Sequence, residues 1–190
     1  MLTNSGFKVL LDLIFSNKKN NIKIFEKEIA FNTRDHGVSK LNLQVAFSFF
    51  TQLISYIFNG LISSKFIGFV IIGGFGFFIH FPILITLYNI LEFSFYTSHI
   101  VATLLTATVN FLANNYLNFY NSKINSVNEL TSAVIKYYII NLPGLITNIG
   151  VASFTYNVLT ENFIFASFAG IIVDTIFKYV VSKTWIWRSN

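Results

Sequence analysis

The chain has 190 residues, 54% of them hydrophobic and only 11% charged, and its mean hydropathy is +0.61. A soluble domain carries about a quarter of its residues as Asp, Glu, Lys or Arg, so this composition indicates a small membrane protein, and the lack of cysteine excludes disulfides and thiol chemistry. The net charge of +5 could suggest a nucleic-acid partner, but we expect none, because the basic residues lie where a cytoplasmic membrane face needs them.

The first 40 residues predict a small α/β segment at a soluble surface. Apolar side chains at helical spacing over residues 5–15 indicate an amphipathic helix. Residues 22–31 mix β-branched, aromatic and charged side chains, which favours a strand. Lys and Arg are frequent from the start of the chain to Lys65, so we expect this segment on the cytoplasmic side of the membrane.

The loop at residues 34–40 concentrates groups that bind phosphate. Arg34 can fork onto two phosphate oxygens, Lys40 adds a point charge, and Ser39 adds a hydroxyl. Backbone N–H groups around Gly37 could supply further donors. The alternative is a solvated basic loop in which Ser39 caps the next helix, and the spacing alone favours that alternative.

Residues 41–64 carry no charge but contain a regular polar stripe. A helix with one polar face suits the plane of the membrane interface better than the lipid core, so we predict an amphipathic interfacial helix here. A fifth membrane span is the alternative. The stripe consists of Gln44, Ser48, Gln52, Ser55 and Asn59.

Four apolar segments follow, each close to the roughly 20 residues that a helix needs to cross a bilayer. All but one of the basic residues from Lys65 onward lie at one end of these segments, and the exception, Lys178, lies near that same end. The two opposite loops contain Glu92, His99 and Glu161 and no Lys or Arg. This asymmetry predicts an all-α polytopic protein of the cell membrane with both termini in the cytoplasm. The segments are residues 66–91, 96–117, 134–159 and 163–181.

The four segments form two weakly similar copies. Lys65 and Phe66 correspond to Lys136 and Tyr137, and residues 114–119 correspond to residues 182–187. Each copy has two spans, so both copies have the same orientation, unlike the inverted repeats of many transporters. The sequence therefore predicts two helical hairpins arranged as a parallel repeat.

Polar residues inside the predicted spans are candidates for function, because polar groups are costly in a bilayer. They are His80, Asn110, Asn114, Asn115, Asn141, Asn148, Asp174 and Lys178. Asp174 and Lys178 are four residues apart and share a helix face, so we expect an ion pair; a transport role is the alternative. Asn114, at a span end, is expected to hydrogen-bond between helices. We assign no catalytic residue and no metal ligand.

Two span ends, residues 116–123 and 183–188, are both aromatic and basic. Trp, Tyr, Lys and Arg at such ends are ordinary anchors at the membrane interface. Lys183 and Arg188 could also hold the phosphate of an anionic lipid. The pattern by itself does not separate the two roles.

Residues 31–41 resemble the end of the catalytic domain of polyprenyl-phosphate sugar synthases, the dolichol-phosphate mannose synthases of glycosyltransferase family 2. Residues 6–12 resemble the helix just upstream in those enzymes. Residues 65–188 resemble the GtrA-like domain that some of these enzymes carry at their C-terminus, with matching points at Lys65, Phe66 and the two aromatic-basic span ends. The resemblance implies three parts: a catalytic-domain remnant at 1–40, an interfacial helix at 41–64 and a four-span domain at 65–190.

The resemblance also implies ligands and partners. Arg34, Ser39 and Lys40 would contact phosphate of the nucleotide donor or of the lipid acceptor. The partners would be the lipid bilayer, polyprenyl phosphate and a separate glycosyltransferase catalytic domain, and a homo-oligomer is compatible with this interpretation. A divalent metal is implied for that catalytic domain; this sequence has no Asp-x-Asp motif, so we expect no cofactor in it.

The leading hypothesis is the membrane-anchoring part of a polyprenyl-phosphate sugar synthase of the mannose type, which presents the lipid phosphate. The alternative is a stand-alone GtrA-type translocase of a lipid-linked sugar. A third hypothesis, an unrelated four-span exporter, would need a free carboxylate near mid-span, and its candidate, Asp174, has Lys178 beside it.

Overall fold

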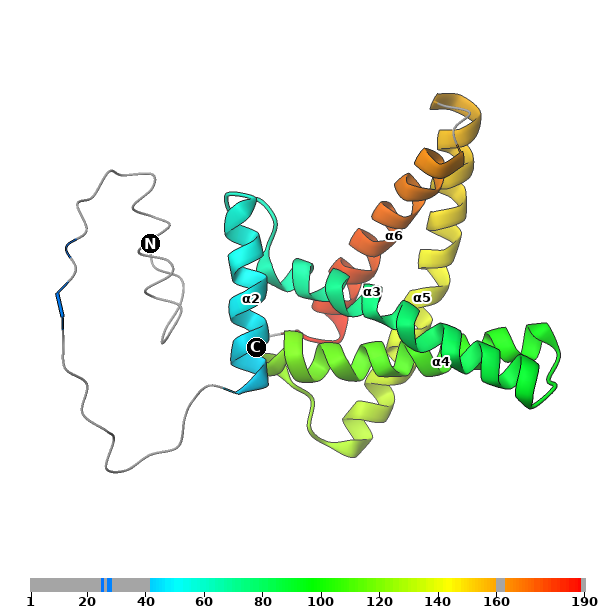
Figure 1. Ribbon diagram of the computed structural model, residues 1–190, viewed down its shortest axis with the longest axis horizontal. Helices are drawn as coiled ribbons and strands as arrows, with labels where there is room; N and C mark the ends of the chain where they lie inside the picture. The colour runs from blue at the N-terminus through cyan, green and yellow to red at the C-terminus, as the bar shows by residue number, and fades with distance from the viewer. Residues whose placement is uncertain (1–24, 26, 29–41, 160–162, 189–190) are drawn as a thin grey trace.

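The computed structural model describes residues 25, 27–28, 42–159 and 163–188 (Figure 1). These residues form helices joined by turns, and no strand occurs among them. The predicted N-terminal helix, most of the predicted strand and the phosphate-binding loop with Arg34, Ser39 and Lys40 lie outside the described residues.

Helix α2 spans Leu43–Ile57 and begins at Asn42, whose side chain accepts a hydrogen bond from the Val45 N–H at 2.9 Å. The helix stops before the expected end at residue 64, because Asn59 and Gly60 have positive φ angles of 53° and 76°. Asn59 therefore belongs to a turn and not to the polar stripe of the helix. A helix of 15 residues is about 22 Å long, which is too short to cross the roughly 30 Å hydrocarbon core.

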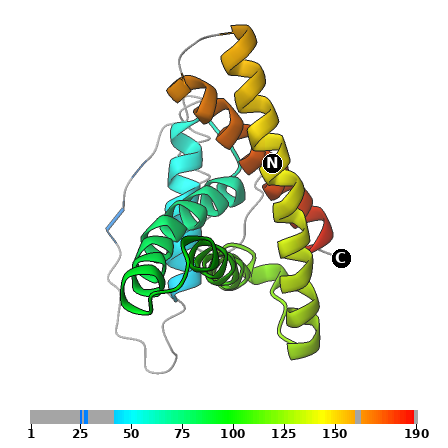
Figure 2. The same ribbon diagram turned by 90° about the vertical axis from the view of Figure 1, so that its right-hand side faces the viewer.

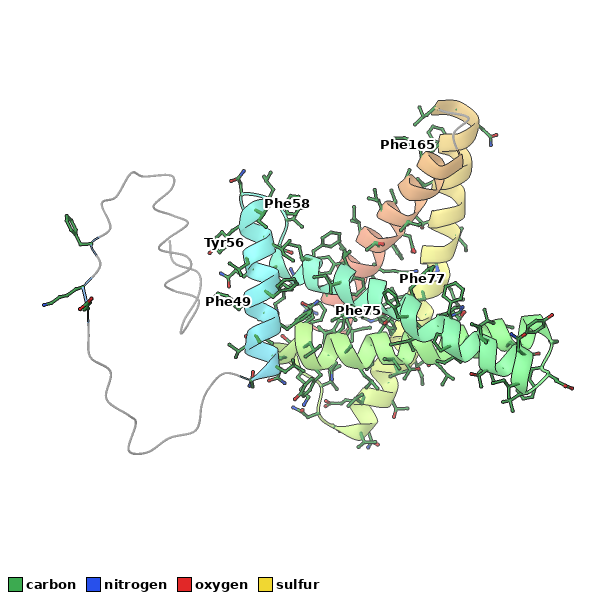
Figure 3. The ribbon with its side chains drawn as sticks, viewed as in Figure 1. Phe49, Tyr56, Phe58, Phe75, Phe77 and Phe165 are labelled. Atoms are coloured by element: carbon green, nitrogen blue, oxygen red, sulfur yellow. The ribbon has the colours of Figure 1, made fainter. Side chains whose placement is uncertain are left out.

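The polar stripe of α2 points in an unexpected direction. Thr51 and Gln52 are buried against the protein, whereas Phe49 and Phe50 are exposed (Figure 3). A helix at a water surface would show the opposite pattern. The outward apolar face of α2 suits contact with lipid, and its inward polar face becomes part of the protein interior.

The first hairpin contains α3, Ser64–Ile85, and α4, Phe95–Ala113. Ser63 and Ser94 cap the two helices, since each side chain accepts a backbone N–H from the first turn. Both helices end in a π-helical turn: η1 covers Thr86–Ile90 and η2 covers Asn114–Asn118. The two helical stretches agree closely with the predicted segments 66–91 and 96–117.

The second hairpin contains α5, Val127–Phe154, followed by the π-helical turn η4, Thr155–Leu159, and α6, Phe163–Trp185. A short 3-10 turn, η3, Tyr120–Ser122, leads into it. Helix α5 begins seven residues before the predicted segment 134–159, and α6 extends four residues beyond the predicted end at 181. The polar first turn of α5 explains the first difference, because hydropathy marks the apolar stretch and not the whole helix.

The two hairpins cross each other, with α3 beside α4 and α5 beside α6 (Figure 1). Helix α4 also contacts α5, which joins the hairpins near their crossing. Helix α2 runs across the end of the first hairpin, and the turned view in Figure 2 shows it alongside α3 and α4. This arrangement brings the start of α3, the end of α4, the start of α5 and the end of α6 together.

The surface of the hairpins is apolar. Phe75, Phe77 and Phe78 of α3 are 64%, 67% and 75% exposed (Figure 3). By length and composition, Ser64–Ile90 and Ile100–Asn118 qualify as membrane-crossing helices within the described residues. A bilayer is the solvent that such an exposed apolar surface requires. That all four helices cross it stays a prediction.

Candidate functional site

The four converging helix ends share one aromatic core. The Trp187 ring stacks on Phe119 with 4.4 Å between centroids and an interplanar angle of 6°, and on Phe111 at 5.4 Å. Tyr137 of α5 contacts the same tryptophan edge-on, at 6.3 Å. Aromatic pairs of this kind contribute about 0.5–1.5 kcal/mol each beyond the area that they bury. The core therefore fixes the position of the last residues of α6 relative to the first hairpin.

Asparagines at the end of α4 tie the chain together around this core. Asn115 accepts hydrogen bonds from the Ile124 N–H at 3.0 Å and from Trp187 Nε1 at 3.1 Å, and it donates to the Ile124 carbonyl. Asn118 donates to the Lys65 carbonyl at 2.8 Å and to Asn114 Oδ1 at 3.1 Å. Asn114, for which we predicted a hydrogen bond between helices, donates instead to the Asn110 carbonyl of α4 at 2.9 Å. The hydrogen bond to α3 comes from Asn118, which follows it by four residues.

Basic side chains surround the aromatic core. Lys65 lies over the Phe119 ring at 5.3 Å, Lys136 over Trp185 at 5.9 Å and Lys183 over Tyr179 at 5.8 Å. Because these lysines belong to α3, α5 and α6, the structure places the cations of three helix ends on the same side of the hairpins. The lysines that the sequence places at one end of the apolar segments therefore also lie on one side of the folded protein.

A small polar cavity lies where α2, α3 and η2 meet, and we call it the head cavity. Its volume is about 120 Å³, several times the space that one water molecule occupies. Lys65 is the charged residue among its lining, and the first backbone N–H groups of α3 are at Ser64 and Lys65. The N-terminus of a helix favours an anion, because the helix dipole is positive there. The remaining lining comes from Phe47, Ser48, Thr51, Leu117, Asn118, Tyr120 and Asn121.

An apolar groove of about 200 Å³ lies beside the head cavity, along α3 and α4. Phe47 and Leu117 line both spaces, so the two are neighbours. Ile72, Phe75 and Ile79 supply one wall of the groove from α3. Together, the head cavity and this apolar groove offer one cationic, hydrogen-bonding end and one hydrocarbon-lined end.

A different groove, which we call the mid-span groove, opens between α3, α4 and α5, with a volume of about 320 Å³. Polar side chains from all three helices reach it. Glycines make the close approach of α3 and α4 feasible: a Cβ on Gly76 would lie 2.5 Å from the Asn110 side-chain nitrogen. The polar side chains are those of His80, Thr103, Thr106, Asn110, Tyr137 and Asn141.

The ion pair predicted inside the fourth segment is present. Lys178 Nζ lies 2.7 Å from Asp174 Oδ2, and both side chains are largely shielded from solvent. Gly144 of α5 packs directly against this pair, so a Cβ there would collide with both side chains. The carboxylate is thus neutralised and enclosed, which does not suit a free proton-coupled acid.

The predicted phosphate ligands are distributed differently. Lys183 and Arg188 are exposed at the end of α6 and are not among the residues that line the head cavity. Arg34, Ser39 and Lys40 lie outside the described residues, so their role stays a prediction. Lys65 lines the head cavity, and Lys136 lines a separate space together with Glu129. Neither lysine was among the predicted phosphate ligands.

The family comparison agrees with this architecture. Residues 68–187, more than half of the chain, match the model of the GtrA/DPMS transmembrane domain. The chain belongs to the GtrA/DPMS transmembrane-domain family. The matched residues run from the first turns of α3 to Trp187 of the aromatic core, and helix α2 precedes them. No curated protein matches the chain.

Membership of the GtrA/DPMS family connects the chain with membrane-associated glycan biosynthesis that uses polyprenyl-phosphate sugars.

The mid-span groove was not predicted from the sequence, although a signal for it was present. Gly73, Gly76 and His80 have the spacing i, i+3, i+7, and Thr103, Thr106 and Asn110 repeat it. Such spacing puts each set on one helix face.

Proposed function

We propose that this domain holds a polyprenyl phosphate at the membrane face formed by its basic helix ends, and that it anchors and presents this lipid to a sugar-transferring domain. The observation that carries the proposal is that the head cavity, which Lys65 lines, adjoins the apolar groove along α3 and α4. A phosphate on an isoprenoid chain has the same two-part chemistry.

The energetics favour such a ligand over a neutral lipid. A phosphate carries one to two negative charges, and hydrogen bonds that involve a charged group contribute about 1.5–3 kcal/mol each. The Lys65 ammonium and the positive end of the α3 dipole attract the phosphate. The hydrocarbon chain is already in an apolar solvent in the bilayer, so the groove adds packing contacts to it and no further hydrophobic free energy. The phosphate would remain near the interface, where its remaining hydration costs least.

Other residues would extend the site. Lys183 and Arg188 are exposed near the same face and would raise its positive potential. Arg34, Ser39 and Lys40 precede α2 in the chain and would contact the phosphate from the side on which the transferase domain binds. The metal and the nucleotide-sugar site would belong to the separate catalytic domain, and mannose would be the sugar if the chain serves a mannose-type synthase.

A binding measurement tests the lipid site. Purified protein in nanodiscs should bind farnesyl phosphate, and farnesol should bind at least ten-fold more weakly. Lys65→Ala should weaken the binding of farnesyl phosphate by about ten-fold, which corresponds to 1.4 kcal/mol. Lys123→Ala is the matched control, because Lys123 is a basic loop residue that lies over Tyr116 outside the cavity. Equal effects of the two substitutions would contradict the site.

A transfer assay tests the role. The chain should be expressed with and without a co-encoded glycosyltransferase catalytic domain, and sugar transfer to polyprenyl phosphate should be measured. We expect transfer only with the catalytic domain, and a higher rate when this chain is present. Sugar transfer by this chain alone, or a partner rate that this chain does not change, would contradict the proposal.

The mid-span groove favours a second candidate function, translocation of a lipid-linked sugar, because a pure anchor has no need for polar side chains at that depth. In reconstituted vesicles, a translocase would move a polyprenyl-phosphate sugar to the far leaflet, while loss of the chain in cells would leave its synthesis intact. Unchanged movement with and without the protein would eliminate this function.

A further inference from the structure

We infer that the mid-span groove is a second binding site, separate from the head cavity, and that it takes a neutral polyhydroxyl group: the sugar of a polyprenyl-phosphate sugar. The inference rests on the proposed function for the identity of the lipid carrier. The class of the ligand group comes from the groove itself.

The depth of the groove is the first argument. Asn141 follows Lys136 by five residues and His80 follows Lys65 by 15 residues, so they lie about 7 Å and 22 Å from the basic ends of their helices. The hydrocarbon core is about 30 Å thick. The groove therefore reaches from near the basic face to beyond the middle of a membrane that the helices cross.

The chemistry of the lining is the second argument. The lining offers amide, hydroxyl and imidazole groups, and the described residues that form it include no Asp, Glu, Lys or Arg. Such groups can both donate and accept hydrogen bonds, as sugar hydroxyl groups do. A metal cation or a phosphate would find no opposite charge here. The aromatic rings of Phe77 and Tyr137 give the groove the mixed apolar and polar walls that are typical of ligand sites.

An unsatisfied hydroxyl is the third argument. Thr106 Oγ1 is buried and has no hydrogen-bond partner among the described residues. A threonine in a helix usually bonds to a carbonyl of the preceding turn, as Thr108 and Thr175 do at 2.8 Å and 2.7 Å. A buried hydroxyl without a partner costs about 1–3 kcal/mol. Thr106 also lines the groove, so a rotation of its side chain would turn the hydroxyl toward a ligand hydroxyl and recover this free energy.

The alignment of α3 against α4 places the polar side chains of the two helices at the same level of the mid-span groove. Gly76 faces Asn110, and because α3 and α4 are antiparallel, the same register puts His80 level with Thr106. Gly73 has no atom within 4 Å of an added Cβ, so space remains at the basic end of the groove. Gly76 thus lets α3 approach Asn110 closely, and Gly73 leaves room at the basic end of the groove.

The two sites lie on adjacent faces of α3. The apolar groove uses Ile72, Phe75 and Ile79, and the mid-span groove uses the positions one residue further on, Gly73, Gly76 and His80. One residue turns an α-helix by about 100°. A lipid-linked sugar could therefore pass from the head cavity to the mid-span groove around a single helix.

Photo-crosslinking tests the inference. The probes are farnesyl phosphate carrying a glucose with a diazirine on the sugar, and farnesyl phosphate with a diazirine at the end of its isoprenoid chain. In nanodiscs, the sugar diazirine should label residues 103–110 or 137–141. An excess of unlabelled glucosyl or mannosyl farnesyl phosphate should reduce this labelling, and farnesyl phosphate alone should not.

Substitutions then separate the two sites. Thr106→Val should lower labelling of the mid-span groove by about three- to ten-fold, the equivalent of one lost hydrogen bond, and should leave labelling of the head cavity unchanged. Thr175→Val is the matched control, because its hydroxyl bonds only to the Ile171 carbonyl, outside the groove. With the sugar probe, Lys65→Ala should lower labelling only at residues 47–51 and 118–121, which line the head cavity.

The outcomes test the sugar site and the lipid-phosphate site separately. Absence of groove labelling by the sugar probe, or equal labelling there by the chain-end probe, would overturn the sugar site. Equal losses in Thr106→Val and Thr175→Val would do the same. Retained labelling of the head cavity in Lys65→Ala would instead contradict the proposed lipid-phosphate site and leave the groove inference standing.

Discussion

Phe119 and Trp187 stack almost in parallel, with ring centroids 4.4 Å apart, although 68 residues separate them in the sequence. They occupy equivalent positions in the two predicted copies of the hairpin, so these corresponding residues are in contact. Trp187 Nε1 also donates to Asn115 Oδ1 at 3.1 Å. This pair connects the last turn of the chain with the end of α4.

Trp187→Ala should destabilise the protein by about 3–5 kcal/mol, because it removes a buried aromatic ring and leaves a cavity. Trp187→Phe should keep part of the stacking and cost less, chiefly through the lost hydrogen bond to Asn115. Thermal unfolding in detergent measures both. The control is Trp185→Ala, since Trp185 is 48% exposed; a similar loss there would contradict the role of the stack.

Gly76→Ala should destabilise the first hairpin by about 1–3 kcal/mol, because the new methyl group must displace Asn110 in a close helix contact. Gly73→Ala, one turn earlier, should change stability by less than about 0.5 kcal/mol, since nothing lies within 4 Å of its added Cβ. Unfolding in a denaturing detergent series would compare the two. Equal effects would show that α3 and α4 are not in close contact at Gly76.

Lys178→Met should cost about 3–5 kcal/mol, because it leaves the Asp174 carboxylate buried without its counter-charge. The double substitution Asp174→Leu with Lys178→Met should recover most of this loss, since it removes both charges. A double-mutant cycle on unfolding free energies measures the coupling. Additive effects would mean that the pair contributes nothing as a pair.

Cysteine labelling tests the topology, and the native chain helps because it contains no cysteine. Asn125→Cys, in the turn before α5, should react with an impermeant maleimide only from the cytoplasmic side, and Leu91→Cys, after η1, only from the opposite side. Arg34→Cys and Arg188→Cys should follow Asn125→Cys. Labelling of Arg34→Cys and Arg188→Cys from different sides would refute the proposed membrane face.

The two grooves show where sequence reasoning was limited. The polar stripes on α3 and α4 could each have been found from their spacing, because helix periodicity is local information. That they face each other across Gly76 depends on the register of two helices, which periodicity does not contain. The same limit applies to α2: its polar stripe was recognised, but its inward direction depends on what packs against it.

The sequence by itself determined the apolar segments, the end of each that carries the cations, and the pairing of Asp174 with Lys178. These features depend on hydropathy, charge and spacing within single helices, which neighbours in the chain decide. The tertiary structure alone decided that Lys65 lines a cavity, that α2 turns its polar side inward, and that Phe119 meets Trp187. Those contacts join residues far apart in the chain, and they form only where packing fixes the crossing of two hairpins.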